Sequence, residues 1–232
     1  MLYQQDWLYQ YGATVAYFFL DIIGPDVQLT IFGLMFLFYS GLFLGIGEVA
    51  NMAGVALCVP IAQKIGKKST FILVNAALVV FSISFFFVPC TQSGFWTMLI
   101  LQVIISIFTG IMSPLIWSMY ADVSDYAELK YNTASTGLIF SSASMAQKFG
   151  GAIGGAAVLW LLSGFGYVTD AAQLEAGVVQ PESALMVLRW LMSFIPAMVA
   201  GLAIIVVWFY PLTTKRVEEI NAKLKKAREF DM

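Results

Sequence analysis

Lys148 is the side chain whose type and position most directly indicate a functional site. It is the only Lys, Arg, His, Asp or Glu in the stretch Tyr131–Val168. A lone cation within a membrane-spanning helix is costly and marks a substrate, ion or pairing site. Ser144 lies one helical turn before it and Gln147 is its neighbour, so hydroxyl and amide groups share this region. This mixture of donors and acceptors is suited to binding a polar substrate.

Three carboxylates, Asp122, Asp125 and Glu128, recur at three-residue spacing just after an apolar stretch that ends at Tyr120. In one interpretation they belong to a solvated polar loop, Asp122–Asn132. In the other they form a cytoplasmic gate, which pairs with basic residues of the other half of a carrier when its cavity faces outward and releases them when it opens inward. We do not expect them to bind a sugar directly.

Trp117 and Glu48 are two further candidates. Trp117 either stacks on the apolar face of a sugar ring or belongs to the aromatic belt at a membrane surface. Glu48 falls inside a long apolar stretch, where a carboxylate is a candidate for coupling to a cation.

Four glycines follow Lys148 and form two overlapping patterns at four-residue spacing: Gly150, Gly151, Gly154 and Gly155. Small residues at this spacing let membrane helices approach closely. We therefore expect a helix-packing surface here, with a direct sugar contact as the alternative.

The elements that position these side chains must be membrane helices. Of the 232 residues, 60% are hydrophobic and 11% are charged, against about 25% charged in soluble domains. Polar groups cannot cover such a surface, so the lipid bilayer is the expected solvent. The chain has no His and two Cys, from which we expect no catalytic residues, no metal site and no enzyme. We also expect no nucleic-acid partner.

Hydropathy and helix-breaking residues divide the chain into six predicted spans, an all-α membrane fold with a charged tail over residues 213–232. The spans are about 7–23, 27–61, 70–88, 95–120, 133–167 and 184–210. The second is too long for one straight crossing, and we interpret it as one long or tilted helix with an interfacial first turn.

The basic residues predict the orientation. Of the 12 Lys and Arg, all except Lys148 and Arg189 fall in connections or in the tail on one side of this six-span order. The positive-inside rule makes that side cytoplasmic, with both termini there. The tail is either a simple topology anchor or a helix that binds the lipid surface or regulates the protein.

Three stretches resemble one transporter family, the glycoside–pentoside–hexuronide:cation symporters of the major facilitator superfamily, to which the melibiose permease belongs. The segment Asp122–Lys130 resembles the loop between the family's helices ten and eleven. Gly137–Gly150 resembles its eleventh helix, and Gly66-Lys67-Lys68 resembles the basic turn between helices eight and nine.

This resemblance implies a fold and a function. The chain would be the C-terminal half, helices seven to twelve, built as a 3+3 inverted repeat, and present as a fragment or half of a split gene. Its function would be symport of a sugar or glycoside with Na⁺ or H⁺ across a bacterial-type inner membrane by alternating access. The missing N-terminal six-helix half would be its partner and would hold most of the cation site. The family's Lys at the place of Lys148 supports sugar binding and coupling; the alternative is that Lys148 pairs with a carboxylate of that missing half.

Two other functions stay open at this point. The chain is compatible with a carrier of the same fold for another solute, such as a sulfonated sugar or a lipid. It is also compatible with a non-transporting six-span subunit that pairs with another protein.

Overall fold

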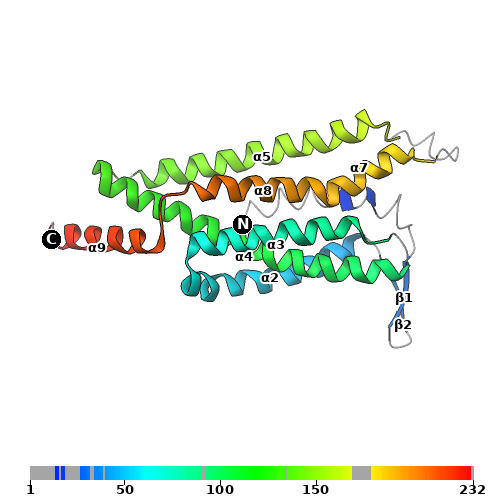
Figure 1. Cartoon of the computed structure of the whole chain (residues 1–232), viewed down its shortest axis with the longest axis horizontal. Coiled ribbons are helices and arrows are strands. Elements are labelled where there is room, and N and C mark those ends of the chain that lie inside the picture. The colour runs from blue at the N-terminus through cyan, green and yellow to red at the C-terminus, as the bar shows by residue number, and fades with distance from the viewer. Residues whose placement is uncertain are drawn as a thin grey trace.

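The computed structural model describes residues 14–15, 17–18, 27–31, 34–38, 40–89, 92–133, 135–168 and 179–230. Its larger helices run side by side along the long axis of the molecule (Figure 1). In chain order the elements are β1 (Val27–Ile31), β2 (Leu34–Phe38), α2 (Ser40–Ile65), α3 (Lys67–Phe86), α4 (Gln92–Tyr131), α5 (Thr136–Gly164), α7 (Glu182–Met192), α8 (Phe194–Trp208) and α9 (Thr214–Phe230).

The described residues contain five helical segments that are long and apolar enough to cross a membrane: Gly41–Ile65, Lys67–Phe86, Gly94–Tyr131, Thr136–Gly164 and Glu182–Trp208. They correspond to the second to sixth predicted spans, so the fold is helical and membrane-spanning, as expected. Most of the first predicted span, 7–23, lies outside the described residues.

The second predicted span, 27–61, is wrong in its first third. Residues Val27–Ile31 and Leu34–Phe38 form an antiparallel hairpin, in which Val27 pairs with Phe38 and Ile31 with Leu34. The sequence of β1, Val-Gln-Leu-Thr-Ile, alternates apolar and polar residues with the period of a strand. The helix therefore begins at Ser40, and its 26 residues are enough for one crossing without a long tilt.

The helix that contains the fourth predicted span, 95–120, continues beyond it to Tyr131. Helix α4 has 40 residues, about 60 Å of helix, whereas a hydrocarbon core is about 30 Å thick. The predicted loop Asp122–Asn132 is helical as far as Tyr131, and Asn132 ends it with a φ of 50°. Asn tolerates this left-handed conformation, which is a common way to end a helix.

The last predicted span, 184–210, is two helices joined at Ser193. The Ser193 hydroxyl donates to the Arg189 carbonyl at 2.6 Å, which satisfies an acceptor at the break. Pro196, in the first turn of α8, has no N–H with which to continue the ladder of α7. The interruption is therefore local, and α7 and α8 together still form one candidate span.

Helices α2 and α4 approach each other backbone to backbone. A Cβ atom added to Gly54 would lie 2.9 Å from the Ile107 carbonyl carbon and 3.1 Å from the Gly110 Cα. The two backbones meet directly there, as membrane helices do when small residues face each other.

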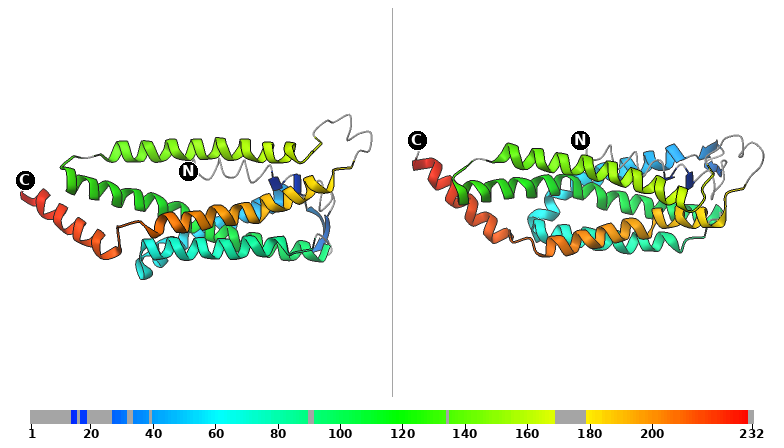
Figure 2. Two further views of the ribbon diagram at one scale, coloured as in Figure 1. Left: turned by 45° about the horizontal axis from the view of Figure 1, so that its top comes forward. Right: turned by 90° about the horizontal axis from the view of Figure 1, so that it is seen from above.

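Helix α5 lies along one edge of the bundle (Figure 2, left). Only 6% of its span is buried, against 22–39% for the other four candidate spans. One long face of α5 is therefore left uncovered within the described chain.

The predicted segregation of basic residues is visible in the fold. The α2–α3, α4–α5 and α8–α9 connections share one end of the bundle, and the β1–β2 hairpin lies at the other (Figure 1). The first end carries the basic residues Lys64, Lys67, Lys68, Lys130, Lys215 and Arg216, and α9 continues outward from it. The tail is helical, as predicted.

Candidate functional site

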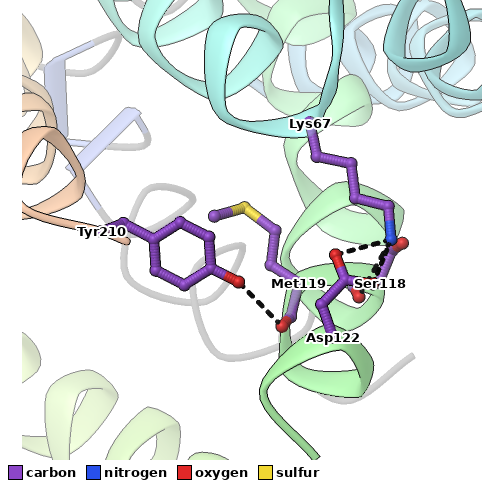
Figure 3. A network of polar contacts seen from close by, with 5 residues as sticks. All are labelled: Lys67, Ser118, Met119, Asp122 and Tyr210. Atoms are coloured by element: carbon purple, nitrogen blue, oxygen red, sulfur yellow. Dashed lines mark hydrogen bonds and ion pairs between the residues drawn. The ribbon is translucent and has the colours of Figure 1, made fainter. Parts of the chain in front are cut away.

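An ion pair between Lys67 and Asp122 organises the basic end of the bundle. Gly66 turns the chain with a φ of 85°, so α3 begins at Lys67. The Lys67 Nζ lies 2.7 Å from each carboxylate oxygen of Asp122, and it also donates to the Ser118 carbonyl at 3.4 Å (Figure 3). Asp122 is only 6% exposed, so this pairing neutralises a carboxylate that water barely reaches.

The sequence predicts that Asp122 pairs with basic residues of the other half of a carrier when the cavity faces outward, and this pairing stays a prediction. Within this chain, the partner of Asp122 is Lys67. The sequence contained both residues, 55 positions apart. Their proximity depends on how α3 packs against α4, which the sequence alone did not give.

Tyr210 and Lys68 join the end of α8 to the same place. The Tyr210 hydroxyl donates to the Met119 carbonyl at 3.3 Å (Figure 3). Burial, and then the charge of Asp122, raise the pKa of this phenol well above its ordinary value. The Lys68 Nζ donates to the carbonyls of Trp208 and Tyr210, both at 2.8 Å, and so places a cation at the carboxyl end of α8.

Asp125 and Glu128 continue along α4 from Asp122 at the same three-residue spacing, and both are half-buried. Because this segment is helical, the three carboxylates lie on one side of α4 over successive turns. The predicted loop is therefore a helix as far as Tyr131, and it carries all three carboxylates.

Lys148 lies near the middle of α5, on its exposed side, with Gln147 half-buried beside it. The Ser144 hydroxyl, one turn earlier, donates to the Phe140 carbonyl at 2.9 Å. Its oxygen keeps acceptor capacity toward a ligand. Among the residues that the structure describes, Lys148 is the only Lys, Arg, Asp or Glu on α5.

Trp117 of α4 is brought against the same helix. Its ring stacks on Phe140 with centroids 5.7 Å apart and an interplanar angle of 14°, and it meets Tyr120 edge-on at 5.8 Å. Phe140 precedes Lys148 by two helical turns, about 12 Å along the axis. The structure thus brings Trp117 to the helix that carries Ser144, Gln147 and Lys148, although with its ring face already occupied on one side.

The predicted packing surface at the glycines is not found at Gly150, where a Cβ atom would meet nothing within 4 Å among the described residues. Gly151, Gly154 and Gly155 are half-buried, and the packing role of the four glycines stays a prediction. A close glycine contact that was not predicted lies at Gly54 and Gly110. Its signal was present in the sequence, because Ser106 and Gly110 repeat small residues at four-residue spacing within an apolar stretch.

Glu48 is half-buried on α2, next to a polar seam between α2 and α4. Asn51, Gln102 and Ser106 of this seam are buried, and a Cβ on Gly47 would lie 2.8 Å from the Gln102 amide nitrogen. The seam was not predicted. No cluster of three or more potential metal ligands occurs among the described residues.

Comparison with known proteins gives a consistent result. Residues 7–214 match the family model described as MFS/sugar transport protein. A glucuronide carrier protein homolog of Escherichia coli (strain K12) is 30% identical over 82% of this chain and 40% of its own length. The inner membrane symporter YicJ of the same organism is 32% identical over 78% of this chain and 38% of its own length. An isoprimeverose transporter of Lactiplantibacillus pentosus is 29% identical over 80% of this chain and 36% of its own length. The chain thus spans about 40% of the length of these curated relatives or less.

Proposed function

Because the chain belongs to the MFS/sugar transport protein family, we propose that it is the C-terminal six-helix half of a sugar:cation symporter. The substrate would be a glycoside, pentoside or hexuronide, and the coupling ion Na⁺ or H⁺. The printed names of the relatives, which include a glucuronide carrier, a symporter and an isoprimeverose transporter, support this class. The family and these relatives are transporters, which confirms the prediction that the chain is not an enzyme.

The observation that carries the proposal is the position of Lys148. An ammonium group on the uncovered face of a membrane helix cannot face hydrocarbon without a large cost. That face of α5 is therefore best explained as one wall of a water-filled cavity. Lys148, Ser144 and Gln147 would offer hydrogen bonds to a sugar on this wall, and Trp117 would offer an aromatic surface beside it.

The opposite wall would come from the N-terminal half, which also would hold most of the cation site. Alternating access would then proceed by rocking of the two halves around a site near the middle of the membrane. Glu48 is our candidate in this half for a contribution to coupling.

At the basic end, α4 would supply the gate. Asp122 is held by Lys67, so Asp125 and Glu128 are the carboxylates that we assign to contacts across the two halves. We assign this end to the cytoplasmic side of a bacterial-type inner membrane because it gathers the Lys and Arg residues.

Lys148→Ala in the intact carrier tests the assignment. Hydrogen bonds from a charged donor contribute about 1.5–3 kcal/mol, so we expect the apparent sugar affinity to fall about 10- to 100-fold. Radiolabelled sugar uptake and direct binding measure the loss, and immunoblotting of membranes measures insertion, which should not change.

Lys148→Arg keeps the charge, and Lys130→Ala removes an exposed Lys from the end of α4. The first should retain part of the activity and the second most of it. Uptake at the normal level with Lys148→Ala would refute the site.

One observation favours a different solute on the same fold. A putative sulfoquinovose importer of Escherichia coli is 27% identical over 73% of this chain. A cationic wall suits an anionic sugar, so competition of uptake by neutral, carboxylated and sulfonated sugars separates these substrate classes.

A further inference from the structure

The end of α4 that carries the gate carboxylates has a second, apolar stripe. Its members are Val123, Tyr126 and Leu129, each one position after an acidic residue of the gate. Successive residues of a helix point about 100° apart, so the acidic and apolar stripes run side by side along the same stretch of about two turns. A segment that packs against the apolar stripe therefore also sets the direction in which the carboxylates point.

Helix α9 holds this stripe. Leu212, Ile220 and Leu224 are buried in a small core with Val123, Tyr126 and Leu129. The Arg216 guanidinium lies over the Tyr126 ring, 5.8 Å from its centroid. Helix α9 extends from the end of α8 beside this part of α4 (Figures 1 and 2).

The start of α9 is anchored as well. Gly66 leaves room for the Thr214 hydroxyl, which a Cβ atom at Gly66 would overlap. Lys68 binds the carbonyls of Trp208 and Tyr210 just before α9 begins, and Tyr210 binds the Met119 carbonyl of α4. The segment is thus attached to α3 and α4 before it reaches the apolar stripe.

The remaining surface of α9 is suited to water. Its exposed residues carry both signs of charge and include Lys215, Glu218, Glu219, Lys225, Lys226 and Glu229. A helix that lies on a membrane turns an apolar face to the lipid, but the apolar face of α9 is occupied by α4. The contacts therefore favour a role within the protein over the lipid-surface role considered from the sequence.

We propose that α9 is a positioning strap, by which we mean a helix that orders the gate by packing against it. Because α9 packs against Val123, Tyr126 and Leu129, it fixes the rotation of the end of α4 about its axis. The directions of Asp122, Asp125 and Glu128 are fixed as a result. This inference rests on the proposed carrier function for the meaning of the gate. Almost all of α9 lies beyond the family match, which ends at residue 214.

Hydrogen exchange in the intact carrier tests the strap without any transport assay. Leu224, 7% exposed, is changed to Ala; the matched control is Leu202→Ala on α8, where the side chain is 60% exposed. We expect amides of residues 122–131 to exchange at least about tenfold faster in Leu224→Ala, with α2 and α3 unchanged. Leu202→Ala should leave residues 122–131 as in the parent protein.

A second pair of variants, with milder substitutions, keeps the test valid if Leu224→Ala does not fold. Two cations lie over the Tyr126 ring, Lys130 at 5.6 Å and Arg216 at 5.8 Å. Arg216→Ala removes the one that α9 supplies, and Arg216→Lys restores a cation at the same place. We expect faster exchange of residues 122–131 in the first variant and partial rescue in the second. Lys226→Ala, on the exposed side of α9, should have no effect.

The transport readout separates positioning from sugar binding. Loosening the strap should change the maximal uptake rate at least about twofold with little change in sugar affinity, because α9 does not line the Lys148 wall. Unchanged exchange of residues 122–131 in both Leu224→Ala and Arg216→Ala would overturn the strap, as would equal loosening of all helices. If the carrier moves no sugar, the proposed function fails, while the exchange experiment still decides whether α9 orders the end of α4.

Discussion

At the scale of single residues, the basic end is held by a few polar contacts that span distant parts of the chain. Lys67 neutralises Asp122, Lys68 binds the last carbonyls of α8, and Tyr210 binds the Met119 carbonyl. Unpaired polar groups are expensive where water is scarce. These contacts therefore fix the relative positions of α3, α4 and α8 at this end of the bundle.

Tyr210→Phe is predicted to change the alkaline stability of the protein. Because burial and Asp122 raise the pKa of Tyr210, the folded state holds the phenol proton more tightly than the unfolded state does. That stability is fully present below about pH 10, the unfolded pKa, and is lost as the pH rises toward the folded pKa. At neutral pH the lost hydrogen bond should cost about 1 kcal/mol.

Thermal unfolding from pH 7 to pH 11 measures both effects. The parent protein should lose stability above about pH 10 more steeply than Tyr210→Phe does. Tyr131→Phe, at an exposed position at the end of α4, is the control. The same alkaline slope in the parent and in Tyr210→Phe would contradict the argument.

At the scale of elements, the helices differ in how firmly they are packed. The backbones of α2 and α4 touch at Gly54 and Gly110, whereas α5 is largely uncovered. A backbone contact leaves no side chains that can yield, so α2 and α4 are expected to move together. Helix α5 has the exposed face that its proposed role as a cavity-lining helix requires.

Two glycine substitutions test this difference. A Cβ at Gly110 would overlap the Asn51 carbonyl, so Gly110→Ala should destabilise the protein by about 1–3 kcal/mol. Gly150→Ala meets open space and should be neutral or stabilise its helix by about 0.5–1 kcal/mol. Thermal unfolding of both variants in the same detergent gives the comparison. Equal destabilisation by the two would mean that another part of the carrier packs on Gly150, as the sequence first indicated.

At the scale of the whole molecule, charge divides the bundle into two unlike ends. The basic turn, the end of α4 and α9 lie together, and the hairpin lies at the opposite end (Figure 1). Basic residues are retained on the cytoplasmic side during insertion. The fold and the proposed orientation are therefore mutually consistent.

Cysteine labelling measures the orientation. In a background with Cys58 and Cys90 replaced by Ser, a cysteine is introduced at Val179, which is 83% exposed, or at Lys226. An impermeant maleimide added to intact cells should label Val179→Cys and leave Lys226→Cys unlabelled until the membrane is opened. The reverse pattern would invert the proposed topology.

The sequence by itself determined the membrane class and five of the helical segments, and most of the ends of these segments are correct to within a few residues. It also indicated Lys148 as a candidate site residue, which stays a prediction. These follow from composition, hydropathy and the cost of a charge in lipid, all of which act locally along the chain. The first span and the sugar site stay predictions. Local patterns were misread at Val27–Phe38, where alternation favours a hairpin, and at Asp122–Tyr131, where polar residues looked like a loop.

Only the tertiary structure shows which distant segments of the chain contact each other. It paired Asp122 with Lys67, placed α9 on the apolar stripe of α4, and put the close glycine contact at Gly54 and Gly110 rather than at Gly150. The physical reason is common to all three. A helix face shows from its own residues that it must be covered or neutralised, but which distant segment covers it depends on how all the helices pack at once.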